Sequence, residues 1–370
     1  MSIVLTKGDA EKILSGSLFL GCGGGGDDTV GKSIIEKAVP KGVELVSLDE
    51  VPQEGLFLTI SPVGSPASTE SHCDDDTYER IITLFKQKQK EDPRVPQGEV
   101  VGLLPCEIGA LSSFCPMMTA SLCGIPVVDA ACDGRAHPFG SMGSLGLEKR
   151  GGVVVQVCAG GKREKNYYVE VSVIASVDAA ANIIRTSAAN AGGMVAVARN
   201  PIDYAWMKKT AAPGAYSFAR RIGESFAQEG SAAQKLQAVC DTIGGQIVAE
   251  GVVGDILIET KNALDYGRFT ITTDAGEVYA MTFCNEYMSM DGPDGERKFT
   301  FPDFMATCTA EDGKPVSTAK LKKGDRVFLL GSSRHNMLLG QGLRYRAPYL
   351  RLEDALGIEM LRYVGDIIDD

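Results

Sequence analysis

The chain has 370 residues, of which 44% are hydrophobic and 23% charged, a composition typical of globular proteins. A net charge of −11 and a pI of about 5.0 argue against nucleic acid and anionic membrane surfaces as partners. No apolar run approaches the ~20 residues of a membrane span, and the first residues lack the apolar core of a signal peptide, so we expect a cytoplasmic protein.

The N-terminal part of the sequence alternates helical and strand-like segments, which predicts an α/β architecture. Thr6 is expected to cap a first helix over residues 6–15. Further helices are predicted at residues 27–38, 78–89 and 112–122, and strands at residues 43–47, 56–60, 100–104 and 125–129. We therefore expect a Rossmann-like α/β domain over residues 1–165.

The remaining residues, 166–370, are predicted to form an α+β domain. Strands at 153–158 and 167–174 are followed by expected helices at 179–189, 201–209, 216–227 and 232–243. From about residue 250 to 335, regular turn dipeptides such as Asp291-Gly292 and Gly324-Asp325 separate strand patterns, which predicts a small barrel or sandwich. A last helix is expected over residues 352–363.

The ten cysteines are scattered and form no Cys-x-x-Cys pair, so neither a zinc ribbon nor a thioredoxin motif is expected. In a reducing compartment they are expected to be buried thiols without disulfides. Cys22, Cys106 and Cys132 fall near the candidate site described below, where we expect buried bystanders rather than a nucleophile.

Four consecutive glycines precede the second predicted helix: Gly23, Gly24, Gly25 and Gly26. Because each glycine costs conformational entropy on folding, such a run is expected where the backbone turns with positive φ or approaches another group closely. Together with Gly21 the run matches the dinucleotide fingerprint, but the apolar segment before it is short. Asp27 and Asp28 would also repel a phosphate at the helix N-terminus. We expect no nucleotide, and favour a loop whose N–H groups line a small-molecule pocket over a purely structural turn.

Three polar loops follow predicted strands, where open α/β sheets place their ligands. They carry the following ionisable residues: Glu70, His72, Glu107, Asp129, Asp133, Arg135 and His137. Carboxylates can activate water, and Arg or His can stabilise developing negative charge, so the set suits hydrolysis. His with carboxylates could also hold a divalent metal. The structural alternative is that Asp129 and Asp133 cap turns and that Arg135 pairs with one of them.

These motifs together resemble the family named for S-methyl-thiohydantoin desulfurase, which is often grouped with hydantoinase and oxoprolinase proteins. The resemblance rests on the glycine run and on the segments 64–70, 106–109, 127–138, 213–217, 285–286, 301–303 and 324–327, and so covers nearly the whole chain. Two departures concern the site. Ala131 stands where the family pattern has an acidic residue, and His137 stands where it has an aromatic one.

The resemblance implies hydrolysis at C2 of a thiohydantoin-like ring, with release of a thiol. On this hypothesis Glu107 or Asp129 is the base, with Asp133 in the catalytic set and Arg135 as the electrostatic partner. The glycine loop would hold ring carbonyls, and Glu70 and His137 would contact the substrate. The alternatives are a metal-dependent cyclic amide hydrolase, with metal held by Asp129, Asp133, His137 or Glu107, and a non-catalytic subunit that binds a small cyclic metabolite. A homo-oligomer is the default assembly.

Overall fold

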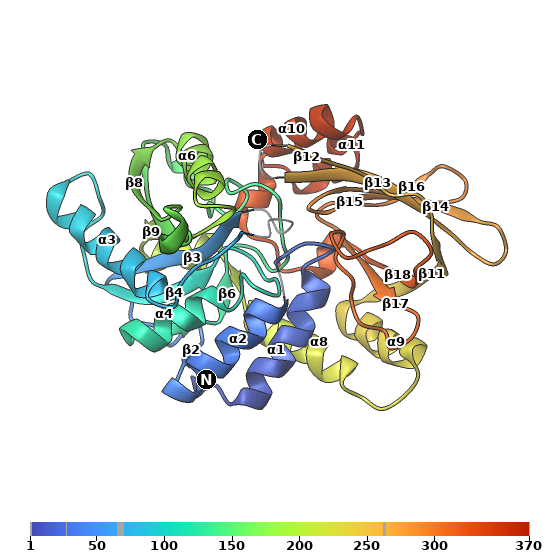
Figure 1. The fold of residues 1–370 in the computed structure, drawn as a ribbon, viewed down its shortest axis with the longest axis horizontal. Coiled ribbons are helices and arrows are strands. Elements are labelled where there is room, and N and C mark those ends of the chain that lie inside the picture. Colours follow the sequence, from blue (N-terminus) through green and yellow to red (C-terminus); the bar gives the residue numbers. More distant parts are fainter. Residues whose placement is uncertain (1, 27, 65–69, 262–263, 370) are drawn as a thin grey trace.

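The computed structural model describes residues 2–26, 28–64, 70–261 and 264–369, and its elements form two parts, each built on one large sheet (Figure 1). Asp27 and the loop residues 65–69 lie outside the described residues. The α-helices are α1 Lys7–Leu20, α2 Asp28–Ala38, α3 Thr77–Glu91, α4 Cys115–Cys123, α5 Leu147–Arg150, α6 Val177–Asn190, α7 Tyr204–Thr210, α8 Ala215–Phe226, α9 Ala232–Ile243, α10 Arg346–Leu356 and α11 Leu361–Val364. None of the helices in these ranges is long and apolar enough to cross a membrane.

The first sheet has eight strands in the order β1-β2-β5-β4-β3-β9-β7-β8. Their bounds are β1 Ile3–Val4, β2 Glu44–Val46, β3 Leu56–Gly64, β4 Val100–Pro105, β5 Val127–Val128, β7 Val154–Gly160, β8 Val169–Ala175 and β9 Met194–Ile202. The four strands β2, β5, β4 and β3 run parallel, and antiparallel strands extend the sheet on both sides. The predicted α/β class is therefore confirmed.

Helices cover both faces of the first sheet, as alternate residues of its strands show. On β7, Val157 belongs to the core cluster that contains Phe85 of α3, whereas the next residue, Cys158, packs with Ile184 of α6. Figure 1 shows α6 on one side of the sheet and α3 with α4 on the other. Strands buried on both faces explain why the predicted strands read as continuous apolar runs.

Three predicted segments need correction. The predicted helix at residues 201–209 starts too early, because Pro201 and Ile202 belong to β9, a strand that was not predicted. The apolar residues 18–20 continue α1, so the glycine run connects α1 to α2 and has no strand before it. The last predicted helix is two helices, because Gly357 ends α10 with a φ of 67°.

Helix α1 combines a capped start with a close contact to α8. The Thr6 hydroxyl accepts from Asp9 N at 3.1 Å, and Thr6 N donates to the Asp9 carboxylate at 3.2 Å, which completes a capping box. A Cβ added to Gly16 would lie 1.8 Å from Ala219 O, and one added to Gly223 would lie 1.9 Å from Lys12 O. The two glycines therefore permit the close approach of α1 and α8.

The second sheet is antiparallel and runs in the order β16-β15-β14-β13-β11-β18-β17, with β12 paired to β13. Its strands are β11 Gly245–Val253, β12 Leu257–Lys261, β13 Leu264–Thr272, β14 Val278–Cys284, β15 Glu286–Asp291, β16 Arg297–Thr300, β17 Phe304–Thr309 and β18 Arg326–Ser332. These strands occupy the region predicted to be β-rich; its closure as a barrel or sandwich stays a prediction. A small two-stranded sheet joins β6 Ala130–Ala131 to β10 Ala212–Pro213.

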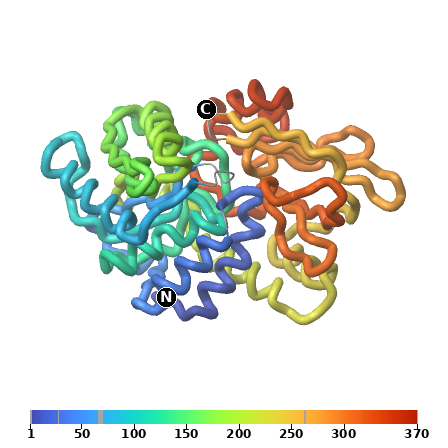
Figure 2. The backbone as a smooth tube through the Cα atoms, viewed as in Figure 1, coloured from blue at the N-terminus to red at the C-terminus, as the bar shows by residue number. Residues whose placement is uncertain are grey.

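The glycine run links the two parts of the molecule. Tyr287 N donates to Cys22 O at 2.8 Å and Thr318 N donates to Gly23 O at 2.9 Å, so the loop is bonded to the second sheet and its flanking loop. On the other side, Leu111 N donates to Gly25 O at 3.0 Å. Figure 2 shows this blue segment beside the orange strands of the second sheet.

Candidate functional site

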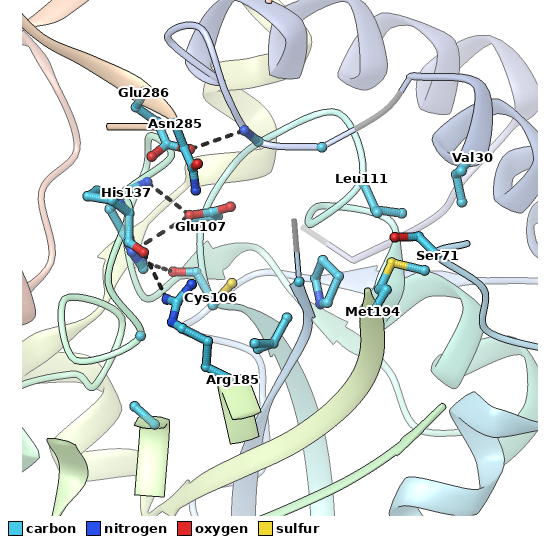
Figure 3. Close-up of a pocket in the computed structure, with 18 of the residues that line it drawn as sticks. Val30, Ser71, Cys106, Glu107, Leu111, His137, Arg185, Met194, Asn285 and Glu286 are labelled. Carbon is cyan, nitrogen blue, oxygen red and sulfur yellow. Dashed lines mark hydrogen bonds and ion pairs between the residues drawn. The ribbon is translucent and has the colours of Figure 1, made fainter. Parts of the chain in front are cut away.

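A pocket of about 290 Å³ lies beside the glycine run and is lined by residues from both parts. Its charged, imidazole and amide side chains are Glu107, His137, Arg185, Arg199, Asn285 and Glu286, and the Cys106 thiol also lines it. Val30, Leu111 and Met194 contribute apolar surface (Figure 3). A small pocket with apolar walls and a few convergent polar groups is typical of binding sites for small molecules.

Glu107 follows strand β4, at the carboxyl end of the parallel part of the sheet, as expected for a ligand-facing residue. Its side chain is 13% exposed, and Oε2 accepts a hydrogen bond from His137 N at 2.9 Å. Burial raises the pKa of Glu107 to about 7, although this hydrogen bond and the charges of Arg199 and Arg135 oppose the shift. Near neutral pH the group can therefore both accept and donate a proton.

His137 is buried and neutral at neutral pH. Burial, with the positive charges of Arg199 and Arg135, lowers the pKa of His137 to about 3. Its Nε2 lies 3.3 Å from Cys106 O, and its Nδ1 lies 3.7 Å from Glu107 Oε2, beyond hydrogen-bonding distance. At neutral pH the imidazole therefore adds no positive charge to the pocket.

Glu286 enters the pocket from the second sheet, where it is the first residue of β15. It is 3% exposed; Oε1 accepts from Gly25 N at 3.3 Å, and Oε2 is buried without a hydrogen-bond partner among the described residues. Burial and the negative charge of Glu107 raise the pKa of Glu286 to about 8. A Cβ added to Gly24 would lie 2.0 Å from Oε1, so the glycine run leaves the space that this carboxyl fills.

Asn285 lies where β14 turns into β15, with a φ of 55° in the left-handed region that Asn tolerates better than most residues. Its Oδ1 accepts from Asp265 N at 3.0 Å, which directs the amide NH₂ away from that bond. In Figure 3 the side chain lies on the same wall of the pocket as the Glu286 and Glu107 carboxyl groups. Asn285 thus offers the pocket a neutral hydrogen-bond donor.

Two arginines bring positive charge to the pocket. Arg199 on β9 is 2% exposed, and its Nε has no hydrogen-bond partner in the described part of the chain. The pairing of β9 with β3 shifts register between Phe57 and Thr59, an irregularity of the kind that redirects side chains next to binding sites. Arg185 on α6 donates to Pro138 O at 3.1 Å.

Asp129, predicted as a possible base, is not among the residues that line this pocket. Its Oδ1 accepts from Tyr216 N at 2.9 Å and from Ser217 N at 3.1 Å, and Ser217 Oγ donates to Oδ2. These are the free N–H groups of the first turn of α8, whose N-cap position is Gly214 and has no side chain to cap them. The structure therefore gives Asp129 a capping geometry, the structural alternative for this residue.

Asp133 and Arg135 are fully buried and do not line the pocket. Asp133 Oδ1 accepts from Gly340 N at 2.8 Å, and burial raises the pKa of Asp133 well above its ordinary value. Arg135 donates to the backbone oxygens of Ala136 and Asp303 and lies over the Phe301 ring at 4.5 Å. Its positive charge lowers the pKa of both pocket carboxyl groups, Glu107 and Glu286.

Glu70 is not among the residues that line the pocket, and it pairs with Lys162 at 3.0 Å and Lys165 at 2.6 Å. Of the four glycines, Gly25 and Gly26 line the pocket. Gly24 N donates to Gly21 O at 2.7 Å, and Gly25 N donates to Glu286. These two amides are thus engaged within the protein.

Among the charged and amide side chains of the pocket, the sequence interpretation missed four as site residues: Arg185, Arg199, Asn285 and Glu286. The apolar run 194–198 that ends in Arg199 is a usable signal, because a charge that follows a buried strand needs a partner. Arg185 shows no such signal. Among the described residues no group of three or more His, Cys, Asp or Glu side chains is arranged to hold a metal ion, and all ten cysteines are free thiols.

Two family models match the chain. The S-Me-THD-like, N-terminal domain matches residues 8–195, and the S-Me-THD-like, C-terminal domain matches residues 175–349. A crystal structure of a protein from Chromobacterium violaceum is similar, with a TM-score of 0.72 and 17% identity over 96% of each chain. At this identity the similarity concerns the fold alone. No curated protein matches the sequence.

Proposed function

The chain belongs to the S-Me-THD-like family, and from this premise we propose that it is a hydrolase of an S-alkylated thiohydantoin-like ring. In the proposed reaction water adds to C2 of the ring, the C2–S bond breaks, and a thiol and a hydantoin are released. The reaction needs a base for water, donors for the ring heteroatoms, and a small pocket that excludes bulk water.

The observation that carries the proposal is the position and protonation behaviour of Glu107. A general base works best when its pKa lies near the working pH, and burial raises the pKa of Glu107 to about 7. Its carboxyl lines the same pocket as the Asn285 amide and the Arg199 guanidinium, two donors for a ring carbonyl or for developing negative charge. We assign Glu107 as the base and these two residues as substrate-binding donors.

The substrate is S-methyl-thiohydantoin, 2-methylthio-imidazol-4-one, in ¹⁸O-labelled water. The test measures the release of methanethiol and the formation of hydantoin. We expect ¹⁸O in the C2 carbonyl of the product hydantoin, and a loss of about 10²-fold or more in kcat for Glu107→Gln. Glu148→Gln is the matched control, because Glu148 is also largely buried with a raised pKa but does not line the pocket. Wild-type protein that releases no thiol contradicts the proposal.

Two further outcomes would favour the alternatives. Opening of an unsubstituted hydantoin ring without thiol release would indicate a cyclic amide hydrolase. Thermal stabilisation by the thiohydantoin without turnover would indicate a binding subunit, because a ligand that binds only the folded state raises its stability. Either result replaces the proposed reaction.

A further inference from the structure

The carboxyl of Glu286 has an environment that folding alone does not explain. The residue is 3% exposed, and within the described residues its carboxyl accepts one hydrogen bond, from Gly25 N to Oε1 at 3.3 Å. The charges of Arg135 and Arg185 act on this carboxyl, but none of the ion pairs within the described residues includes Glu286, and Oε2 is buried without a hydrogen-bond partner there. A buried carboxyl with so few partners is costly, so a glutamine or an apolar residue would serve the fold better.

Both carboxyl groups line one pocket, and they come from different parts of the molecule. Glu107 follows β4 of the first sheet, whereas Glu286 begins β15 of the second. Figure 3 shows the two side chains on the same side of the pocket, with Asn285 next to them. The negative charge of Glu107 raises the pKa of Glu286, which indicates that the two groups interact electrostatically.

We propose that Glu286 is a second catalytic group, which exchanges protons with the substrate in concert with Glu107. This inference rests on the proposed hydrolysis at C2. Like-charged carboxyl groups in one buried site do not ionise together easily, so at neutral pH the pair holds one proton. The resting state is then Glu107 carboxylate with Glu286 protonated.

The proposed steps balance and restore the starting state. In the addition step the water oxygen bonds to C2 while Glu107 takes a water proton; the C2=N electron pair moves to the ring nitrogen, which takes the proton of Glu286. In the collapse step the C2 hydroxyl gives its proton to Glu286 as C2=O forms. The C2–S bond breaks, and its electron pair leaves with sulfur, which takes the proton held by Glu107. The products are the hydantoin and the thiol.

The test compares pH profiles of kcat/KM for the wild type, Glu286→Gln and Glu107→Gln, with Glu148→Gln as the control. We expect a bell-shaped wild-type profile between limbs near pH 7 and pH 8. Glu286→Gln should lose the alkaline limb along with about 10²-fold in rate, whereas Glu107→Gln should lose the acidic limb. Glu286→Asp, which keeps the acid on a shorter side chain, should retain an alkaline limb.

A second substrate isolates the proton delivered to the ring nitrogen. A 1,3-dimethyl-2-methylthio-4-oxoimidazolinium salt carries a permanent ring charge and needs no acid for water addition. The loss of kcat/KM caused by Glu286→Gln should therefore be at least about 10-fold smaller on this substrate, while the loss caused by Glu107→Gln should not change. Two results obtained with an active wild type would refute the role of Glu286 and leave the proposed hydrolysis standing. In the first, Glu286→Gln has the same pH profile and rate as Glu148→Gln. In the second, Glu286→Gln shows the same loss of rate on both substrates. If the wild type is inactive, the proposed hydrolysis itself fails.

Discussion

Replacing Glu286 by Gln should change how the stability of the protein depends on pH. Burial and the charge of Glu107 raise the pKa of Glu286 from 4.5 to about 8 in the folded protein. The native state therefore holds this proton more tightly than the unfolded state, and the group contributes stability that is complete below pH ~4.5 and is lost as pH rises toward 8. Between pH 5 and 7.5 the loss is about 3 kcal/mol, at ~1.4 kcal/mol per pH unit for one proton.

The free energy of unfolding, measured by urea denaturation at several pH values between 5 and 7.5, tests this directly. For Glu286→Gln the slope against pH should be shallower than for the wild type by about 1.4 kcal/mol per pH unit, the value for one proton. Some slope should remain, because burial also raises the pKa of Glu107. Glu250→Gln, at an ion-paired residue on the surface, should leave the slope unchanged. Parallel slopes for the wild type and Glu286→Gln would refute the burial argument.

Three other substitutions have specific expected outcomes. Gly24→Ala should lower kcat by about 10²-fold, because the new Cβ would displace the Glu286 carboxyl. Gly365→Ala is the control and should leave kcat unchanged, because a Cβ added there meets no atom within 4 Å. Equal kcat values for the two variants would contradict the prediction. Arg199→Met should lower kcat/KM by roughly 10- to 100-fold, because the pocket loses a charged hydrogen-bond donor. The melting temperature and kcat/KM are measured on the same variant. An unchanged kcat/KM would exclude contact between Arg199 and the substrate. Asp129→Ala should lower the free energy of unfolding, measured by urea denaturation, by about 1–2 kcal/mol through loss of the α8 cap, and should leave kcat unchanged. Wild-type stability together with lost turnover would instead support Asp129 as the base.

Part of the candidate site could be predicted, because residues that follow parallel strands lie together at the carboxyl edge of the sheet. Glu107 follows an apolar run, and the carboxyl ends of parallel strands meet at one edge, so its place in the lining of this pocket followed from local sequence. The same rule applied to Asp129 does not give a residue of this pocket lining, because local sequence does not show that the N-terminus of α8 lies beside that strand end. Asn285 and Glu286 come from a turn of another sheet, more than a hundred residues later, and nothing local shows which turn reaches the pocket.

The glycine run is the clearest case in which composition predicted the constraint but not its purpose. Gly23, Gly25 and Gly26 have φ values of 94°, 76° and 91°, so the expected left-handed turns are present. Gly24 lies outside that region, and its lack of a side chain leaves room for the Glu286 carboxyl. An alanine there would keep a permitted backbone and lose the space. The requirement for glycine at this position therefore comes from a side chain of the second sheet, the Glu286 carboxyl, which also accepts a hydrogen bond from Gly25 N.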